Sequence, residues 1–547
     1  MSQLFARSVL VLVLLFGLVF AVGAGVLYYY HFPVSYALAF AAIIITLQFI
    51  LGPFIIDWIY KINWMPPQQI APEFADFLAE LCKRRRIPLP RFGVIEDGNP
   101  NAFTYGHVPG DARLVVTRGL LQMLTREEYE AVVAHEVGHI RHYDFIVMTF
   151  AALAPLLLYM LYAWSRDRRQ GGAAAVAMSV GAYVAYIVSN YVVLFLSRVR
   201  EYFADEHAAE SVADANSIST ALVKIAYGLA RIPQVDPQQQ QQGKKAKKRP
   251  ALNKSQLMGS LGICNFSSAT PMALYSTNAA GQFSTDHMMR AMQWDLWNPW
   301  AKLFELQSSH PLVAHRVAAA SRIAYRRRQT PILPPSTPPT ESYWPSFLVD
   351  LIFVALPWIG LAFGLLFAYG VIGRNLSAAS GNGMWALSQL RFIFLLGGLG
   401  WLLRLAFSYG SGFRERKIVD LVGEVDVSHI RGIPVELEGQ IIGRGVPGLF
   451  WSKDLVMQDD TGFITLIYQQ PLSFIETLFG MFRAEGLVGK KGKIRGWYRR
   501  GPSPYLELLD ARFEDGDRTK CYHKAFMWFL ALAVTAIGVY MTVAGIG

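Results

Sequence analysis

Apolar residues in this chain are gathered into seven runs, each long enough to cross a membrane as a helix. The runs are Val9–Tyr30, Val34–Tyr60, Phe145–Trp164, Gly171–Leu196, Trp344–Tyr369, Met384–Tyr409 and Ala525–Ile546. A single run of this kind can instead be the core helix of a soluble protein, and Gly171–Leu196, which is rich in Ala, Gly and Ser, fits that alternative best. All of them together predict an integral membrane protein. The first run is too long, and too closely followed by the second, to be a cleavable signal peptide.

Shorter patterns between the second and third runs predict a soluble region of helices and strands. Pro72–Arg86 has helical periodicity, whereas Phe92–Glu96 and Arg113–Thr117 have the pattern of strands. Thr125–Glu128 has the sequence of a capping box, and the positions after it give a helix with one apolar face. This helix leads directly into the third apolar run.

A second soluble region, about Ile418–Glu514, alternates apolar and polar positions between Gly, Pro and Asp turns. The predicted strands are Val435–Ile442, Leu455–Gln458, Phe463–Tyr468, Gly492–Tyr498 and Tyr505–Ala511. Five such strands favour a small barrel resembling the OB type. Basic residues interleaved with Trp497 and Tyr498 give it an expected basic side: Lys490, Lys491, Lys493, Arg495, Arg499 and Arg500. Such a surface can bind single-stranded nucleic acid, but tethering to a membrane already accounts for basic residues, so nucleic acid is not an expected partner.

Composition supports the membrane assignment, with 53% apolar residues, 17% charged residues and a mean hydropathy of +0.28. The net charge of +11 comes largely from Lys and Arg clusters in loops on one predicted side, at 83–86, 244–249, 326–328 and 414–417. By the positive-inside rule that side is the cytoplasm. The basic loop at 166–169 falls on the opposite side, which leaves open whether the hairpin of residues 145–196 crosses the bilayer fully.

The strongest chemical signal is the H-E-x-x-H sequence at His135–His139, on the helix that follows the capping box. Residues four apart share one face of a helix, so His135 and His139 can bind a single Zn²⁺. Glu136 lies beside them, where it can take a proton from the attacking water. Two ordinary helix histidines are the alternative. In its sequence context the pattern favours a metallopeptidase.

A catalytic zinc site needs a third protein ligand, and Glu201, within Arg198–Asp205, is the best candidate. Asp205 follows one helical turn later and can accept a hydrogen bond from a zinc-binding imidazole. The alternative is a pair of surface carboxylates that pair with the neighbouring arginines. His142 and His207 are rival ligands, which we place outside the metal's own ligand set.

The metal residues flank the hairpin of the third and fourth apolar runs. His139 lies six residues before its start, about 9 Å of helix rise, and Glu201 follows its end by a similar distance. Both metal-bearing helices are therefore expected to continue the membrane helices into the cytoplasm, unless the first of them breaks at Tyr143–Asp144. The site should lie near the membrane surface, with membrane proteins or membrane-tethered segments as substrates. Asn101–Gly106 is either an ordinary hairpin arm or an edge strand that holds an extended peptide.

Four segments of the chain resemble the HtpX-like membrane zinc endopeptidases, which share a clan with the CAAX-prenyl endoproteases and mitochondrial quality-control peptidases. The segments are Asn101–Phe103, His135–His139, Arg200–Asp205 and Ser308–Val317. The resemblance covers roughly residues 1–335 and implies a gluzincin-type α+β zinc peptidase domain. The chain departs from the family at Ser309, where the family has Thr, and in the polar stretch 237–250, which has the composition of a disordered basic insertion. Everything after Thr340 is additional.

The resemblance implies one catalytic Zn²⁺ held by His135, His139 and Glu201. It also implies that Glu136 acts as the general base and then as the general acid. These roles agree with the spacing of the four residues.

The same resemblance assigns residues around the substrate. Asn101, Ala102 and Phe103 would form the substrate-binding edge. His310 and Arg316 would approach the scissile carbonyl and stabilise the oxyanion, as donors aimed at developing negative charge do.

We therefore expect a mainly α integral membrane protein with a gluzincin-type α+β peptidase domain and a small OB-like β-barrel. The expected parts are two N-terminal transmembrane helices (1–65), the zinc metallopeptidase domain (66–340), two transmembrane helices (344–410), the OB-like domain (418–514) and a C-terminal transmembrane helix (525–547). The three cysteines, Cys82, Cys264 and Cys521, form no C-x-x-C pair and suggest neither a disulfide nor a thiolate metal site.

The predicted function is that of a zinc metalloendopeptidase in a bacterial inner membrane, with its active site facing the cytoplasm. Its expected substrates are membrane or membrane-associated proteins in protein quality control, a role that only the resemblance suggests. One rival is CAAX-type processing of prenylated peptides. Another is a membrane scaffold that acts through the OB-like domain and keeps a structural zinc. The sequence gives no indication of the oligomeric state.

Overall fold

The computed structural model describes residue 22 and residues 34–98, 100–167, 172–228, 285–334, 341–374, 389–444 and 453–544. The chain forms two compact units. One consists of Met1–Thr270 with Leu303–Thr337, and the other of Pro271–Lys302 with Pro338–Gly547. Apart from residue 22, the predicted first span lies outside the described residues, as do the predicted insertion at 237–250 and Cys264.

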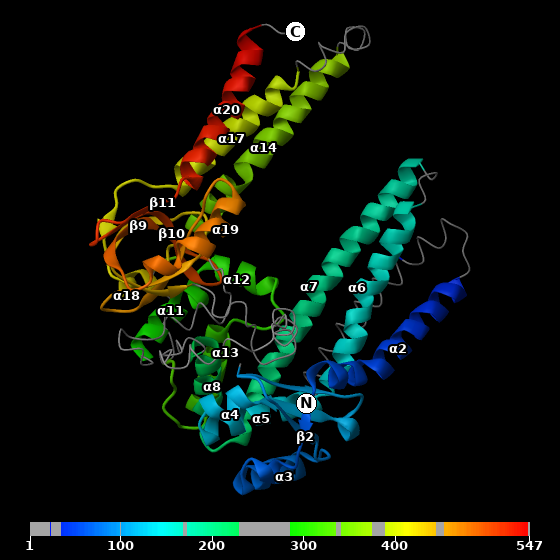
Figure 1. The fold of residues 1–547 in the computed structure, drawn as a ribbon. Helices are drawn as coiled ribbons and strands as arrows, with labels where there is room; N and C mark the ends of the chain where they lie inside the picture. Colours follow the sequence, from blue (N-terminus) through cyan, green and yellow to red (C-terminus); the bar gives the residue numbers. More distant parts are fainter. Residues whose placement is uncertain are drawn as a thin grey trace. The chain divides into compact units, whose positions relative to one another are not determined.

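Five helices of the described residues are long and apolar enough to cross a membrane, and each coincides with a predicted span. They are α6 (Asp144–Asp167), α7 (Gly172–Ser211), α14 (Trp344–Arg374), α17 (Arg391–Ser408) and α20 (His523–Val543). A further predicted span corresponds to α2 (Val34–Tyr60), in which Phe49–Tyr60 counts as a shorter apolar helix. Figure 1 shows α6 and α7 side by side in the first unit, and α14, α17 and α20 as a bundle in the second.

The soluble part of the first unit is built on a four-stranded sheet with the order β1-β2-β4-β3. Its strands are β1 (Asn63–Trp64), β2 (Arg91–Ile95), β3 (Ala102–Tyr105) and β4 (Arg113–Thr117). β2 and β4 are parallel, and β3 pairs antiparallel with β4 as the end strand of the sheet. The strands predicted before and after residues 101–106 are confirmed. Both alternatives for residues 101–106 hold, because β3 forms a hairpin with β4 and is also the edge strand of the sheet.

Helices pack around this sheet, and two of them, α5 (Arg126–Arg141) and α13 (Val313–Arg326), carry candidate site residues. The other helices of this group are α3 (Pro72–Arg85), α4 (Arg118–Met123) and α8 (Asn216–Gly228). The predicted capping box is present, and Thr125 N donates to Glu128 Oε2 at 2.9 Å, which fixes where α5 begins. The apolar face of α5, including Val132 and Val137, is fully buried in a core shared with α3, β2 and α8. This core therefore sets the orientation of α5.

The membrane helices of the second unit pack at backbone distance. A Cβ on Gly360 of α14 would lie 2.2 Å from Leu396 O of α17, and a Cβ on Gly538 of α20 would lie 2.5 Å from Leu395 N. Small residues at such contacts let helix backbones approach one another in a membrane, where van der Waals packing drives association. The three helices therefore form one close-packed bundle.

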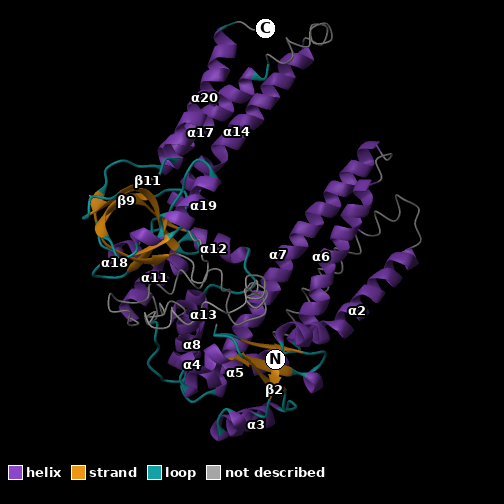
Figure 2. Ribbon diagram, viewed as in Figure 1, coloured by secondary structure: helices purple, strands orange, loops and turns teal. Residues whose placement is uncertain are grey.

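All five strands predicted for the C-terminal region are present, and they close into a barrel (Figure 2). They are β6 (Ile433–Arg444), β7 (Leu455–Gln458), β8 (Phe463–Ile467), β9 (Lys491–Arg500) and β10 (Pro504–Phe513). Neighbours follow the order β6-β7-β8-β10-β9, and β9 pairs with β6 to close the ring. Only the β8–β10 pair of this ring is parallel. The short strands β5 (Arg414–Glu415) and β11 (Arg518–Lys520) pair with β6 and β10, and α19 (Ser473–Phe482) connects β8 to β9.

One helix from the range predicted for the peptidase domain packs on the barrel unit instead. In α11 (Thr285–Trp297), Trp294 Nε1 donates to Val427 O at 2.8 Å. Just after the helix, Asn298 Nδ2 donates to Val425 O at 2.8 Å. Two shorter helices, α12 (Pro299–Leu306) and α18 (Ile418–Val422), also lie among the described residues. The contacts of α11 therefore place it with the second unit.

Candidate metal centre

Three metal-binding side chains converge at one point of the first unit. His135 and His139 come from α5, and Glu201 comes from α7. The two Nε2 atoms of the histidines lie 3.1 Å apart, and each is 3.6 Å from a carboxylate oxygen of Glu201. The ligand atoms of the three residues all lie within 4.8 Å of one another. Two imidazoles and a carboxylate are a ligand set of catalytic zinc sites, so these residues fit that metal.

Each histidine has a carboxylate on its other ring nitrogen. Asp205 Oδ1 lies 3.0 Å from His135 Nδ1, the contact expected from the sequence, and Asp144 Oδ2 lies 2.5 Å from His139 Nδ1. Burial lowers the pKa of the His139 imidazole, but the hydrogen bond and charge of Asp144 outweigh burial and raise it to about 9. Such partners fix the ring orientation and make the other nitrogen a stronger ligand.

The histidine helix is not continuous with the membrane hairpin, contrary to expectation. α5 ends at Arg141, Tyr143 has a left-handed φ of 59°, and α6 begins at Asp144. A residue in this conformation cannot propagate a right-handed helix. α7, in contrast, is a single helix of 40 residues that carries Glu201. The expectation of a continuous helix was therefore right for the acidic ligand and wrong for the histidines.

This break also explains why sequence reasoning missed Asp144. Arg141–Asp144 had the pattern of polar residues ahead of an apolar span, but the turn at Tyr143 brings the Asp144 carboxylate back to His139. Arg200 holds this carboxylate in an ion pair and donates to His142 O at 2.6 Å. The only signal in the sequence was an acidic residue shortly after the second histidine.

Arg316 of α13 is fully buried and contacts the carboxylates of Asp205 and Glu201. Its Nε and Nη2 donate to the two carboxylate oxygens of Asp205 at 2.8 and 2.7 Å. Nη2 also lies 3.4 Å from Glu201 Oε2. One guanidinium therefore balances both carboxylates that α7 brings to the site. The predicted contact of Arg316 with a substrate carbonyl stays a prediction.

His310 approaches the metal ligands from the loop before α13. Its Nδ1 lies 3.2 Å from Glu201 Oε2. The loop is tied to α7 by Arg198, whose Nη1 donates to three main-chain oxygens at 2.7 to 3.2 Å. Those oxygens belong to Glu305, Leu306 and Ser308. α7 therefore positions both a candidate ligand and the segment that carries His310.

Glu136 has a hydrogen-bond partner that the sequence did not reveal. Thr104 Oγ1, on the edge strand β3, donates to Glu136 Oε2 at 3.0 Å. The hydroxyl lies 32 residues away in sequence, so no local pattern could have identified it. The Glu136 carboxylate, which is expected to transfer protons, is therefore hydrogen-bonded to β3, the strand expected to bind the substrate.

The three predicted substrate-binding residues lie on or beside that strand, but their side chains face the protein. Asn101 is fully buried. Its main-chain N donates to Thr117 Oγ1 at 2.7 Å, and its main-chain O accepts from Thr117 N at 2.9 Å. Ala102 is buried, and Phe103 packs against Tyr60 with ring centroids 5.8 Å apart. Only the main chain of this segment is therefore available for pairing with a peptide.

We expect Thr104→Val to lower kcat about tenfold with little change in KM. A hydrogen bond to a charged group contributes about 1.5–3 kcal/mol, and its loss leaves the Glu136 carboxylate without a fixed orientation. Thr104→Ser, which keeps the hydroxyl, is the matched control and should retain most of the activity. Steady-state cleavage of a fluorogenic peptide measures both constants. Equal activity of the Val and Ser variants would show that the hydroxyl is irrelevant.

The two rival histidines lie outside the converging group. His207 Nδ1 bonds to Ala134 O at 2.8 Å. His142 packs against His207 with ring centroids 6.2 Å apart, and burial lowers the His142 pKa to about 4. Both occupy the seam between α5 and α7.

Gly138 allows α5 and α7 to pack closely where they meet. A Cβ at this position would lie 3.2 Å from both Ala204 Cα and His207 Cβ of α7. Because the ligands come from both helices, their separation sets the ligand geometry. We expect Gly138→Ala to lower the free energy of unfolding by about 1–3 kcal/mol, as overpacking does, and to weaken zinc binding. Gly110→Ala, whose Cβ would meet nothing within 4 Å, is the control. Thermal unfolding and metal titration in detergent test this, and an unchanged Gly138→Ala protein would contradict it.

The basic side expected for the barrel is neutralised by carboxylates. Arg495 Nη2 lies 2.5 Å from Asp510, and Arg499 Nε lies 2.7 Å from Glu507. Trp497, the aromatic residue between them, is buried and cannot stack on a base. These pairings remove the pattern that suggested a nucleic-acid surface.

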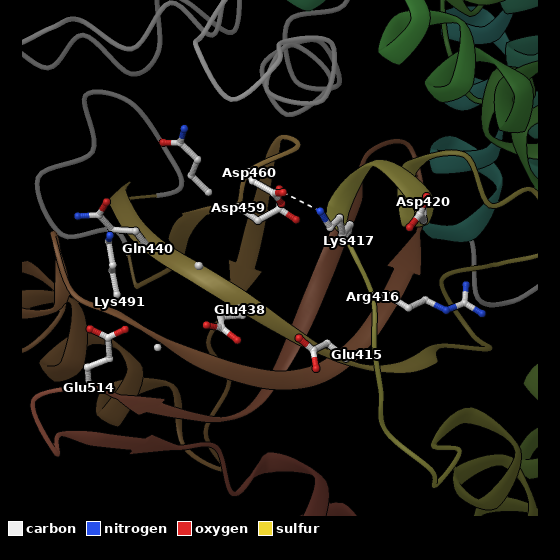
Figure 3. Close-up of a pocket in the computed structure, with 13 residues that line it drawn as sticks. Glu415, Arg416, Lys417, Asp420, Glu438, Gln440, Asp459, Asp460, Lys491 and Glu514 are labelled. Carbon is white, nitrogen blue, oxygen red and sulfur yellow. Dashed lines mark hydrogen bonds and ion pairs between the residues drawn. The ribbon is translucent and has the colours of Figure 1, made fainter.

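A groove on the barrel has the opposite charge (Figure 3). It has a volume of about 940 Å³. Its charged lining residues are Glu415, Asp420, Glu438, Asp459, Asp460 and Glu514 on the acidic side, and Arg416, Lys417 and Lys491 on the basic side. Lys417 is already paired with Asp460 at 2.6 Å. An excess of carboxylates repels phosphate groups, so this groove does not favour nucleic acid either.

Comparisons with known proteins bear on the first unit. Residues 69–324 match the model of Peptidase family M48. A "Protease HtpX homolog" of Methanothermobacter thermautotrophicus is 35% identical over 237 residues, which are 42% of this chain and 89% of that protein. A protein of the same name from Thermoplasma acidophilum is 30% identical and is matched over 72% of its length, 39% of this chain. The crystal structure of S. mikatae Ste24p is 18% identical to this chain, with a TM-score of 0.28, and the match covers 41% of this chain and 60% of that one.

Proposed function

The chain belongs to the HtpX-like proteins of peptidase family M48, which makes it a membrane metalloprotease, and we propose that it is a zinc-dependent endopeptidase acting in protein quality control. Its proposed substrates are membrane or membrane-associated proteins, cleaved on the cytoplasmic side of the membrane. The Lys and Arg clusters of the loops support that orientation, and we assign the protein to a bacterial inner membrane.

The observation that carries this proposal is the convergence of His135, His139 and Glu201 beside Glu136. A structural zinc site has four protein ligands and no use for an adjacent unligated carboxylate. Here the described residues supply three ligands and a carboxylate that faces a donor on the substrate-side strand. This arrangement favours hydrolysis over a purely structural role.

In the proposed mechanism, His135, His139 and Glu201 would hold a zinc ion, which would supply a Lewis acid for the scissile carbonyl and the attacking water. Glu136 accepts the proton of that water and delivers it to the leaving amine. Thr104 holds the Glu136 carboxylate in one orientation during both transfers. The main chain of β3 pairs with the extended peptide, which places the scissile bond across the site.

His310 and Arg316 both approach the Glu201 carboxylate, with a nitrogen 3.2 and 3.4 Å from its Oε2. His310 lies against Glu201, and we propose that its imidazole turns toward the oxyanion when the substrate is bound. Arg316 is bonded to Asp205, and we propose that it contributes mainly its positive charge to the stabilisation of the oxyanion.

The barrel of the second unit is inferred to be of the OB type. Numbered along the chain, its strands close in the order 1-2-3-5-4, with a helix between the third and fourth. A five-stranded barrel of this kind is a binding module in many proteins. Its role in this chain is a separate matter, because the peptidase residues all lie in the first unit.

A tethered substrate tests the proposed substrate class. The same unstructured tail is offered either free in solution or attached to a single membrane span in vesicles that contain the protein. We expect the tethered tail to be cleaved at least about tenfold faster, because tethering raises its effective concentration at the surface to the millimolar range. Mass spectrometry then locates the cleavage sites. Equal rates for both forms would contradict the membrane-substrate proposal, and zinc-loaded protein that cleaves neither would contradict the peptidase proposal.

A further inference from the structure

Within the part of the chain that the structure describes, the helix between the third and fourth barrel strands presents an apolar stripe with no partner. Phe474 and Phe482 of α19 are 59% and 76% exposed, and Leu478 and Met481 are exposed as well. These residues are spaced by four, three and one, so they share one face of the helix. Polar Ser473 begins the helix beside them.

The opposite face of α19 is fixed to the barrel. The Phe479 ring is buried and stacks on Tyr468 with centroids 3.7 Å apart. Glu476 accepts a hydrogen bond from Gln470 N at 2.9 Å and forms an ion pair with Lys453. The helix therefore cannot rotate to bury its stripe, and the stripe points outward in the folded unit.

Hydrogen bonds tie the start of α19 to the start of a membrane helix. Gln470 Nε2 donates to Lys520 O at 2.8 Å, and Tyr522 N donates to Gln470 Oε1 at 3.3 Å. α20 begins at the next residue, His523. Figure 1 shows α19 at the end of the barrel from which the bundle extends. α19 is therefore held at the level where the chain enters the membrane.

The length of α20 fixes that level. Its 21 residues span about 31 Å, which only just covers the roughly 30 Å hydrocarbon core of a bilayer. His523 must then lie at the interface. Tyr522 and Trp344, at the starts of α20 and α14, are both more than half exposed, as interfacial aromatic anchors are.

We propose that the stripe of Phe474, Leu478, Met481 and Phe482 inserts into the headgroup–acyl boundary of the bilayer. A fixed helix with an outward apolar face at interface depth has the properties of an interfacial amphipathic helix. The occupant we assign is lipid, because hydrogen bonds hold α19 beside the residues at which α20 enters the membrane. Inserted in this way, α19 holds the barrel flat against the membrane, in addition to the three helix ends that enter it.

A photocrosslinking amino acid tests this contact in the full chain. p-Benzoylphenylalanine is placed at position 474, 478 or 460, and the protein is reconstituted in vesicles of phosphatidylethanolamine and phosphatidylglycerol. Asp460 is the control: its side chain is 68% exposed, and it pairs with Lys417 next to α18, at the end of the barrel away from the bundle (Figure 1). After irradiation, mass spectrometry measures phospholipid adducts.

We expect lipid adducts at 474 and 478 at least about tenfold above those at 460. The substituted residues are exposed, so the variants should fold, and unchanged cleavage of a peptide substrate verifies this. Crosslinks from 474 to another polypeptide would assign the stripe to a protein partner and overturn the proposal. Adducts at all three positions, or at none, would overturn it too.

Discussion

Glu136→Gln is expected to lower kcat by about 10²–10⁴-fold, the contribution typical of a general base and acid. The amide has nearly the shape of the carboxylate and can still meet the Thr104 hydroxyl, but it cannot accept a proton at neutral pH. None of the three ligand residues changes, so bound zinc should stay at one ion per chain. Casein cleavage by detergent-solubilised protein, with zinc quantified in the same samples, measures both effects.

The comparison with zinc removal completes that experiment. Wild-type protein stripped by a chelator should lose activity and regain it with Zn²⁺, whereas Glu136→Gln should stay inactive with or without the metal. A zinc-loaded Glu136→Gln protein that cleaves as fast as wild type would leave the carboxylate without a catalytic role. That result would support the alternative hypothesis, a membrane scaffold with a structural zinc site.

Arg316→Met is expected to destabilise the protein by about 3–5 kcal/mol, the cost of leaving buried charges without their partner. Arg316 is completely buried and makes two hydrogen bonds to Asp205, with Glu201 3.4 Å away. Without the guanidinium, two carboxylates of α7 face one another in the interior. Zinc neutralises part of this charge, so the loss should be larger in the metal-free protein. Chemical unfolding with and without Zn²⁺ measures it.

Arg326 provides the matched control on the same helix. Its side chain is 66% exposed and forms a loose ion pair with Glu206 at 3.5 Å, so Arg326→Met should change stability by no more than about 0.5 kcal/mol. The double variant Asp205→Asn with Arg316→Met separates pairing from other roles. If the two residues act as a pair, the second substitution should cost much less than it does alone. Additive losses would mean that Arg316 stabilises the protein through other contacts.

The parts of the site that sequence predicted well are those encoded by local spacing. His135 and His139 are one helical turn apart, and Glu201 and Asp205 repeat that spacing on a second helix, so each pair could be placed on a face before any fold was known. Asp144 was missed because its approach to His139 depends on a left-handed residue, Tyr143. The sequence indicated where the helix could break, but not that the break would turn the Asp144 carboxylate toward His139.

The barrel shows the same limit. Alternation of apolar and polar residues identified its strands, but not which strand lies beside which. Arg495 and Arg499 were read as a basic surface, yet β10 lies next to β9. It brings Asp510 opposite Arg495 and Glu507 within 2.7 Å of Arg499 on the diagonal. Charge along one strand therefore predicts a surface only when the neighbouring strand is known.

The unbroken α7 couples the metal site to the thickness of the membrane. Its 40 residues form a lever about 60 Å long, with Glu201 roughly 25 Å beyond the middle of the apolar run. A transmembrane helix that is too long for the local bilayer tilts. A tilt of about 5° would move Glu201, at that distance from the middle of the run, by about 2 Å. The histidines do not follow, because Tyr143 uncouples their helix from α6. A change in membrane thickness would therefore act on the spacing of the ligands themselves, and the close contact of α5 with α7 at Gly138 would oppose it.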